Sequence, residues 1–187
     1  MCCRRAPMFN ASQLGLPLGG ASHTTTARYL DALVDTTMVR RLPPHLPNIG
    51  KRLVKSPKEY LRDSGLLHAM LDLASVRDLQ GHAIAGCVSW EGFVVEQVAV
   101  CLPPDAHLSF YRTAADAEVD LVIEHRAQKV AVEIKFSSAP KPTKGFWQAL
   151  DDLRVTRAFV VAPVPRRYPL AAGVDALPVQ ELAALLG

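Results

Sequence analysis

Three charged residues on two neighbouring predicted strands form the pattern with the clearest chemistry in this sequence. Asp120 stands in the apolar run VDLVIE, and Glu133 and Lys135 stand one residue apart in the alternating run KVAVEIKF. Side chains two residues apart on a strand point to the same face, so Glu133 and Lys135 lie side by side. The turn at 125–128 joins the two strands into a hairpin, which brings Asp120 close to Glu133.

Converging carboxylates beside a lysine are suited to cutting a phosphodiester with a divalent metal. Asp120 and Glu133 offer the oxygen ligands that Mg²⁺ prefers, and the ion would polarise the phosphodiester and activate water. Lys135 would stabilise the developing charge or position that water. Glu91, in the first turn of a helix expected at 90–100, is a further candidate ligand or base. The same pattern is also typical of a solvated strand face, so a structural polar cluster is the alternative.

The elements around these residues predict an α/β domain. Strands are expected at 108–112, 119–124, 129–136 and 157–161, and helices at 90–100, 145–153 and 180–186. The run RAFVV at 157–161 is nearly all apolar, which is typical of an internal parallel strand. This order predicts a central mixed sheet covered by helices, with the carboxylates at one face of the sheet.

Length and composition narrow the class of protein. The chain has 187 residues, of which 49% are hydrophobic, enough for an apolar core and too many for a disordered chain. No apolar run approaches the ~18–20 residues of a membrane helix, and the first residues lack the apolar segment of a secretory signal. We therefore expect a cytoplasmic protein without a membrane partner. Gly50-Lys51 lacks both flanking features of a phosphate loop, so the chain has no ATPase motif.

Positive charge is concentrated in the first third of the chain. Residues 1–63 hold 10 Lys and Arg against 4 Asp and Glu, a formal charge of +6, whereas residues 64–187 hold 11 against 14, a charge of −3. A basic segment favours polyanions such as DNA. Small charge asymmetries are also common in proteins without such partners.

A helix-turn-helix pattern lies in this basic segment. One helix is expected within 10–18 and, after Gly19-Gly20, a second at 23–34 with an apolar stripe; the extended run at 37–42 would form a wing. A winged helix also serves as a structural or protein-docking module, which is the alternative. The residues expected to contact nucleic acid are Ser22, His23, Thr25 and Arg28 in the groove and Arg40, Arg41, Lys51 and Arg52 at phosphates.

The prolines at 43–47 predict a rigid linker, followed by a short strand at 58–62 and a helix at 66–73. We therefore place a winged helix-turn-helix-like segment at 10–63 and the α/β domain at 64–187.

Motifs along nearly the whole chain, from about residue 10 to residue 178, resemble one family. They are similar to the C-terminal region of prokaryotic AAA-type ATP-binding proteins, the domain of unknown function DUF4143. The motifs that carry the resemblance are RRLPP at 40–44, GKRLVKSPK at 50–58, YLRDSGLLH at 60–68, SWEGFV at 89–94, FYRT at 110–113, AEVDLV at 117–122 and VEIK at 132–135.

The resemblance implies a winged-helix-like segment followed by a restriction-endonuclease-like α/β core. In that superfamily's PD-(D/E)xK signature, Glu91 matches the acidic helix residue, Asp120 the metal-binding aspartate, and Glu133 and Lys135 the Glu-x-Lys pair. Gln148 matches a polar position of some nucleases.

Members of the family normally carry an N-terminal ATPase domain, which this chain lacks. The resemblance therefore implies a truncated relict, the product of a broken gene or a stand-alone module, with an ATPase domain in trans as an expected partner. Two functions follow: a DNA-binding protein with a Mg²⁺-dependent nuclease site, or a catalytically inactive DNA- or protein-binding module.

Overall fold

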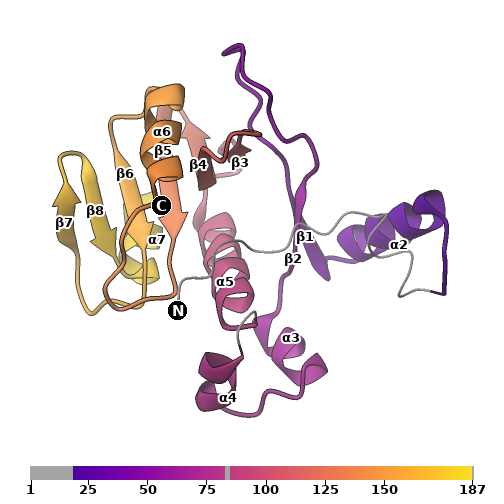
Figure 1. The fold of residues 1–187 in the computed structure, drawn as a ribbon. Helices are drawn as coiled ribbons and strands as arrows, with labels where there is room; N and C mark the ends of the chain where they lie inside the picture. The colour runs from indigo at the N-terminus through magenta and orange to yellow at the C-terminus, as the bar shows by residue number, and fades with distance from the viewer. Residues whose placement is uncertain (1–18, 83–84, 187) are drawn as a thin grey trace.

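Helices cover both faces of a six-stranded mixed sheet in the computed structural model, which describes residues 19–82 and 85–186 (Figure 1). The strand order is β3-β4-β5-β6-β8-β7, which confirms the predicted α/β fold with a central mixed sheet. The strands are β3 (His107–Arg112), β4 (Glu118–His125), β5 (Gln128–Ile134), β6 (Ala158–Val161), β7 (Tyr168–Ala171) and β8 (Val174–Leu177).

Each face of the sheet packs its own apolar core because side chains alternate along the strands. On β5, Val132 packs with α5 (Ala85–Cys101) and α7 (Val179–Leu186), whereas its neighbour Ala131 packs with α6 (Lys144–Leu153) on the opposite face. Both faces are therefore buried, and a charged side chain near the middle of the sheet has little access to water.

The strand pairing follows the sequence patterns. β3, β4 and β5 form an antiparallel meander, and β6 lies between β5 and β8, parallel to both. All four residues of β6 are buried, as its apolar composition predicts. The β7–β8 hairpin is absent from the prediction, although Gly173 marks its turn. Gly173 has a φ of 73°, and an added Cβ would lie 2.4 Å from the Thr156 carbonyl oxygen, so glycine is required there.

A second, two-stranded sheet attaches the N-terminal segment to this domain. It consists of β1 (Val39–Leu42) and β2 (Lys58–Leu61), paired antiparallel. The segment between them runs beside the edge strand β3, where Pro44 forms a parallel bridge with Phe110. Leu42 and Tyr60 complete the apolar core under α5. The segment between β1 and β2 therefore covers a sheet edge that would otherwise expose unpaired backbone groups.

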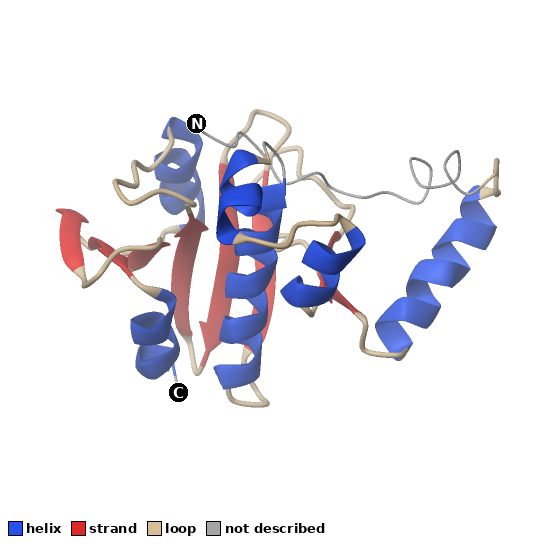
Figure 2. Cartoon of the chain, turned by 90° about the horizontal axis from the view of Figure 1, so that it is seen from below, coloured by secondary structure: helices blue, strands red, loops and turns tan. Residues whose placement is uncertain are grey.

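The helix α2 (His23–Asp35) begins and ends within a residue of its predicted bounds, and Ser22 caps it by accepting a hydrogen bond from the Thr25 N–H at 3.1 Å. The helix stands apart from the sheet in both views (Figures 1 and 2). Thr26 is its one buried residue, and of the predicted apolar stripe Ala27, Leu30 and Val34 are partly buried and Leu33 is 42% exposed. The stripe is therefore only partly covered, because the helix lies away from both cores.

The preceding helix of the expected helix-turn-helix, at 10–18, lies outside the described residues, so the winged helix stays a prediction. Two short helices, α3 (Ser64–Met70) and the unpredicted α4 (Val76–Gly81), connect β2 to α5. Asp63 and Ser75 cap them through their side chains.

None of the helices described for residues 19–82 and 85–186 has the length and apolar character needed to cross a membrane.

Candidate functional site

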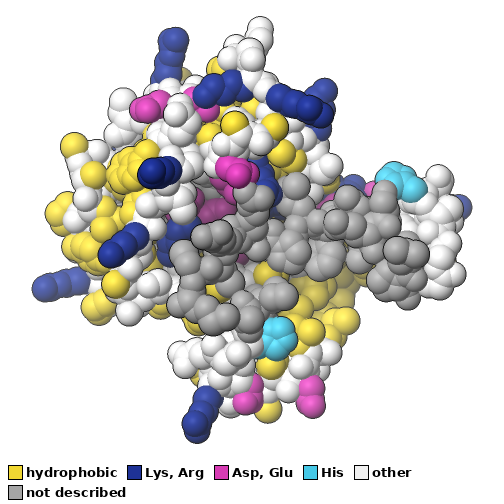
Figure 3. Space-filling model, in the orientation of Figure 1, with side chains coloured by type: hydrophobic (Ala, Val, Ile, Leu, Met, Phe, Trp, Pro, Cys, Tyr) yellow, Lys and Arg dark blue, Asp and Glu magenta, His cyan; other side chains and the backbone are white. Residues whose placement is uncertain are grey.

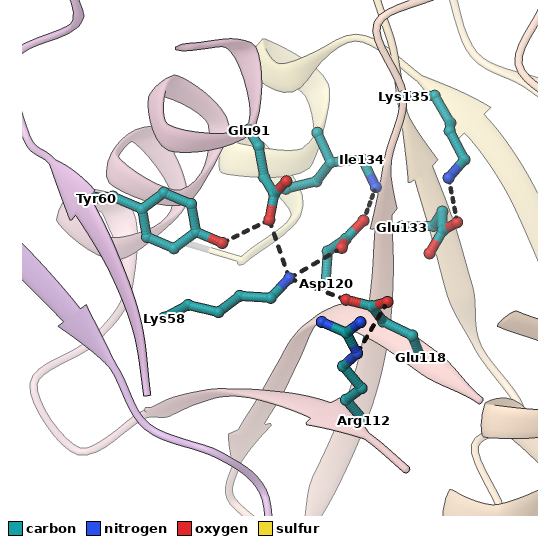
Figure 4. Close-up of polar contacts among 9 residues, drawn as sticks. All are labelled: Lys58, Tyr60, Glu91, Arg112, Glu118, Asp120, Glu133, Ile134 and Lys135. Carbon is teal, nitrogen blue, oxygen red and sulfur yellow. Dashed lines mark hydrogen bonds and ion pairs between the residues drawn. The ribbon is translucent and has the colours of Figure 1, made fainter. Parts of the chain in front are cut away.

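A buried lysine lies at the centre of three carboxylates (Figure 4). The Lys58 Nζ atom is 3.0 Å from Glu91 Oε1, 3.2 Å from Glu118 Oε1 and 3.3 Å from Asp120 Oδ1. Lys58 is 3% exposed and Glu91 is 9% exposed. Of the three N–H donors of this ammonium group, two form hydrogen bonds to Glu91 and Asp120, and Glu118 adds an ion pair.

Separate elements bring these groups together. Lys58 and Tyr60 are two residues apart on β2, so their side chains lie on the same face, and both contact Glu91 on α5. The Tyr60 hydroxyl donates to Glu91 Oε1 at 2.5 Å. Glu118 and Asp120 come from the start of β4, and Glu118 also lies 3.7 Å from Arg112 Nε on β3.

Asp120 connects this group to the predicted Glu-x-Lys pair. Its Oδ1 atom accepts from Lys58, and its Oδ2 atom accepts the backbone N–H of Ile134 at 2.8 Å. Glu133 and Lys135, on either side of Ile134, form an ion pair with each other. Figure 4 shows Asp120 lying between the Lys58–Glu91 contact and the Glu133–Lys135 pair. We call the seven charged residues of this cluster the carboxylate centre: Lys58, Glu91, Arg112, Glu118, Asp120, Glu133 and Lys135.

Burial changes the protonation of the carboxylate centre. Desolvation, and next the charge of Asp120, raises the pKa of Glu133 to about 8, although Lys135 opposes the shift. Burial also raises the pKa of Glu91 against the opposing charge of Lys58. For Lys58, burial lowers the pKa, but the neighbouring carboxylates outweigh it and hold the pKa well above the usual value. Lys58 therefore stays charged, whereas Glu133 keeps its proton to a higher pH than an ordinary glutamate does.

The oxygen donors of the centre suit Mg²⁺ chemically. Mg²⁺ is usually held by one or two carboxylates, with waters and substrate phosphates completing its shell, and Asp120 and Glu133 form such a pair. The centre has four carboxylates against three cations, so it carries an excess negative charge when fully ionised. Within residues 19–82 and 85–186, no group of three or more His, Cys, Asp or Glu side chains is arranged to hold a metal. A two-carboxylate site fits this arrangement, while the ammonium of Lys58 already lies against Asp120.

The four residues predicted to be catalytic lie in the same cluster of the structure. Glu91, Asp120, Glu133 and Lys135, from α5, β4, β5 and the residue after β5, all belong to the carboxylate centre. Gln148 lies apart from these contacts and donates to Asp152 on α6.

The sequence reasoning missed Lys58, Tyr60, Glu118 and Arg112. The alternation of KEYLR predicts the strand β2 without showing that Lys58 and Tyr60 occupy its buried face. A usable signal existed in the family resemblance, because its motifs include both of these residues.

The residues at the start of α2 that were predicted to enter a groove of the nucleic acid are largely exposed. Ser22, His23 and Arg28 are exposed, and Thr25 is partly buried. The Ser22 hydroxyl is engaged with the backbone and side chain of Thr25, so its first role is to cap the helix.

The cations predicted to contact phosphates are mostly paired within the chain. Arg40 forms two hydrogen bonds to Glu96, at 2.6 and 3.1 Å. Arg41 donates to Glu59 at 2.7 Å and to Asp31 at 2.8 Å. Lys51 lies 2.5 Å from Asp152, and Arg52 is exposed. Contact with a phosphate would thus require Arg40, Arg41 and Lys51 to exchange an internal carboxylate for the ligand.

Two family profiles divide the chain between them. The profile of the family "Domain of unknown function (DUF4143)" matches residues 88–182, about half of the chain, and that of "Domain of unknown function (DUF8612)" matches residues 1–77. The DUF4143 match contains Glu91, Asp120, Glu133 and Lys135, whereas Lys58 falls in the DUF8612 match. The carboxylate centre is therefore assembled from both matched segments.

Relatives among curated proteins include the "Uncharacterized protein Rv2008c" of Mycobacterium tuberculosis and the "Uncharacterized protein Mb2031c" of Mycobacterium bovis. Each is 42% identical over 175 residues, which is 94% of this chain and 39% of the relative. The chain thus spans about two fifths of the length of these relatives. No solved structure matches it. The profile match over residues 88–182 confirms the resemblance found in the sequence, and the chain belongs to the DUF4143 family.

Proposed function

We propose that this chain is a Mg²⁺-dependent phosphodiesterase that acts on DNA, with Asp120, Glu133 and Lys135 at its centre. One observation carries the proposal: four residues chosen from the sequence for this chemistry meet in one buried polar centre. An apolar cluster of similar volume often stabilises a fold as well as buried ion pairs do, or better. The position of these charges between two apolar cores is therefore better explained by chemistry than by stability.

Each side chain has a role that follows from its contacts. Asp120 and Glu133 would hold Mg²⁺, which when bound polarises the phosphodiester and lowers the pKa of a water molecule. The backbone N–H of Ile134 orients Asp120. Lys135, held beside Glu133, would place its ammonium against the negative charge that develops on the phosphate. Without metal, Tyr60 and Lys58 hold the Glu91 carboxylate, and Glu91 in turn holds Lys58 beside Asp120, which makes Glu91 a positioning residue.

The surface offers cations for a polyanion. Figure 3 shows Lys and Arg side chains spread along the margin of one face, around acidic side chains nearer its middle. Arg28 and Arg52 are exposed, and Arg41 pairs with the exposed Asp31 and with Glu59, whose side chain is 5% exposed. Exposed ion pairs are worth roughly 0–1 kcal/mol, so a DNA phosphate can replace Asp31 as a partner of Arg41 at little cost.

A cleavage assay tests the proposal. Purified protein is incubated with linear and branched DNA in MgCl₂ or in EDTA, alongside the variants Asp120→Asn and Lys135→Met. We expect cleavage only with Mg²⁺ and a loss of about 100-fold or more in each variant. Lys129→Met, at the opposite end of β5, is the matched control and should keep the wild-type rate. Equal cleavage by the wild type and both variants would reveal a contaminating nuclease and refute the proposal.

A catalytically inactive DNA- or protein-binding module is the second candidate, and the position of Lys58 specifically favours it. A lysine that neutralises Glu91 and Asp120 gives the centre a structural role without any metal. This candidate predicts salt-dependent DNA binding that is the same in Mg²⁺ and EDTA, with intact substrate after long incubation.

A further inference from the structure

We propose that Lys58 is an internal cation that occupies the metal position of the carboxylate centre and competes with divalent cations for Asp120. The inference rests on the proposed function, because it concerns the same metal site. It adds a residue and a form of control: metal binds only when the β1–β2 hairpin withdraws the ammonium of Lys58.

The contacts of Lys58 are those of an occupant of the site. Its Nζ atom lies within 3.0 to 3.3 Å of oxygens from Glu91, Glu118 and Asp120, which belong to two different elements. Lys58 contacts Asp120 Oδ1, whereas Asp120 Oδ2 accepts a hydrogen bond from the Ile134 N–H. An ion approaching Asp120 therefore meets one oxygen held by the backbone and one held by Lys58.

The charge of the centre favours exchange of one cation for another. Glu91, Glu118 and Asp120 surround the ammonium of Lys58, and Arg112 lies beside Glu118, so without Lys58 these four groups carry two more negative charges than positive ones. Glu133 and Lys135 pair with each other. Lys58 offsets one of them, whereas a divalent cation in its place offsets both. Leaving the position empty is unfavourable, since the buried carboxylates around it would then lack a counter-ion. The metal must therefore enter as Lys58 leaves.

The strand that carries Lys58 indicates which part of the chain would move when metal enters. It belongs to β2, in the small sheet outside the six-stranded sheet, and its Nζ atom lies 5.4 Å from the centre of the Phe110 ring. Its side chain is 4% exposed, so the ammonium has no route to water without movement of β2. Tyr60, two residues along, donates to Glu91 and would leave with it. The N-terminal segment thereby controls access to carboxylates of the DUF4143 segment.

Metal titration of Lys58→Met tests the inference without any substrate. Titration calorimetry with MnCl₂ and thermal unfolding with and without MgCl₂ compare this variant, the wild type and Lys55→Met, which removes an exposed lysine three residues away. We expect Mn²⁺ to bind Lys58→Met at least about tenfold more tightly than the wild type, and Mg²⁺ to raise its Tm more. Lys55→Met should match the wild type in both measurements.

A second pair of variants keeps the test decisive if Lys58→Met fails to fold. Lys58→Met/Glu91→Gln removes one cation and one carboxylate together, and Glu91→Gln alone is its control. The double variant should bind Mn²⁺ more tightly than Glu91→Gln.

Three results would count against Lys58 as a competitor. Equal Mn²⁺ affinity with and without Lys58 overturns this inference and leaves the phosphodiesterase proposal standing. Weaker affinity after removal of Lys58 overturns it as well, because the lysine would then support the metal. Absence of Mn²⁺ and Mg²⁺ binding in every protein, including the variants without Lys58, overturns the proposed function and this inference together.

Discussion

The carboxylate centre and the N-terminal surface both use ion pairs, but the pairs differ in their access to water. In the centre, Lys58 and Glu133 are each 3% exposed, so neither can lose its partner without facing an apolar core. On the N-terminal surface, the Arg41 side chain is 35% exposed and that of its partner Asp31 is 57% exposed. Water and salt weaken such pairs. The same residue types therefore make one region rigid and leave the other able to exchange partners.

Removing the central cation should give the largest effect. In EDTA, we expect Lys58→Ala to lower the free energy of unfolding by about 3–5 kcal/mol, because it leaves Glu91 and Asp120 buried without a counter-ion. Urea unfolding measures this change. Lys55→Ala, on the same segment and exposed, should stay within about 0.5 kcal/mol of the wild type. A similar small change for Lys58→Ala would mean that water reaches the centre freely.

The raised pKa of Glu133 should appear in the pH dependence of stability. Its pKa is about 8 in the folded protein against an ordinary 4.5, so the unfolded chain releases this proton first. Stability contributed by the protonated form is therefore lost as pH rises from about 4.5 to 8 and changes little above that range. Glu91, whose pKa is also raised, adds to the same trend.

Glu133→Gln should flatten this pH dependence by on the order of 1–3 kcal/mol between pH 5 and 8. Urea unfolding at pH 5, 6.5, 8 and 9 measures it, with Glu124→Gln on the half-exposed end of β4 as the control. An unchanged slope in Glu133→Gln would show that Glu133 is already ionised at low pH.

Patterns of apolar residues predicted most of the fold. The alternation in β5 and the apolar run of β6 place both strands correctly, because burial of one or two faces imposes those periods. The β7–β8 hairpin was not predicted because its strands YPLA and VDAL have four residues each and are interrupted by Pro169 and Asp175, so Gly173 is their clearest signal. The predicted apolar stripe of α2 is only partly buried, because a stripe alone does not say which partner covers it.

Spacing on one hairpin predicted three of the seven residues of the carboxylate centre. Asp120, Glu133 and Lys135 lie on adjacent strands of one hairpin, so local pairing rules bring them together. Lys58 reaches the same place from a separate sheet, 62 residues before Asp120 in the chain. No local period encodes such a long-range contact, which depends on how the hairpin β1–β2 lies against α5 and β3.

An intermediate effect is expected at Glu96 on α5, which joins the two regions. Burial raises the pKa of Glu96, but hydrogen bonds from Arg40 and Arg62 outweigh burial and hold it below 4.5. Its contribution to stability is present above pH 4.5 and is lost as pH falls through the lowered value. Glu96→Gln should cost about 1–2 kcal/mol at pH 7 and remove this acid sensitivity. Acid unfolding curves that coincide for the variant and the wild type would contradict the ion pairing of Glu96.

The smallest change in stability is expected at Arg41, where it can be separated from an effect on DNA. Arg41→Ala should cost on the order of 1 kcal/mol, because its pair with Asp31 lies at the surface, whereas the Glu59 side chain is only 5% exposed and would lose this partner. If Arg41 exchanges these partners for a phosphate, the variant should bind duplex DNA less tightly, with a salt slope reduced by about 1. Fluorescence anisotropy at several salt concentrations measures both quantities. Arg166→Ala, which removes an exposed arginine from the other end of the chain, is the control. An unchanged salt slope of DNA binding in Arg41→Ala would show that Arg41 contacts only Glu59 and Asp31. The N-terminal surface would then resemble the carboxylate centre, whose charges pair within the chain.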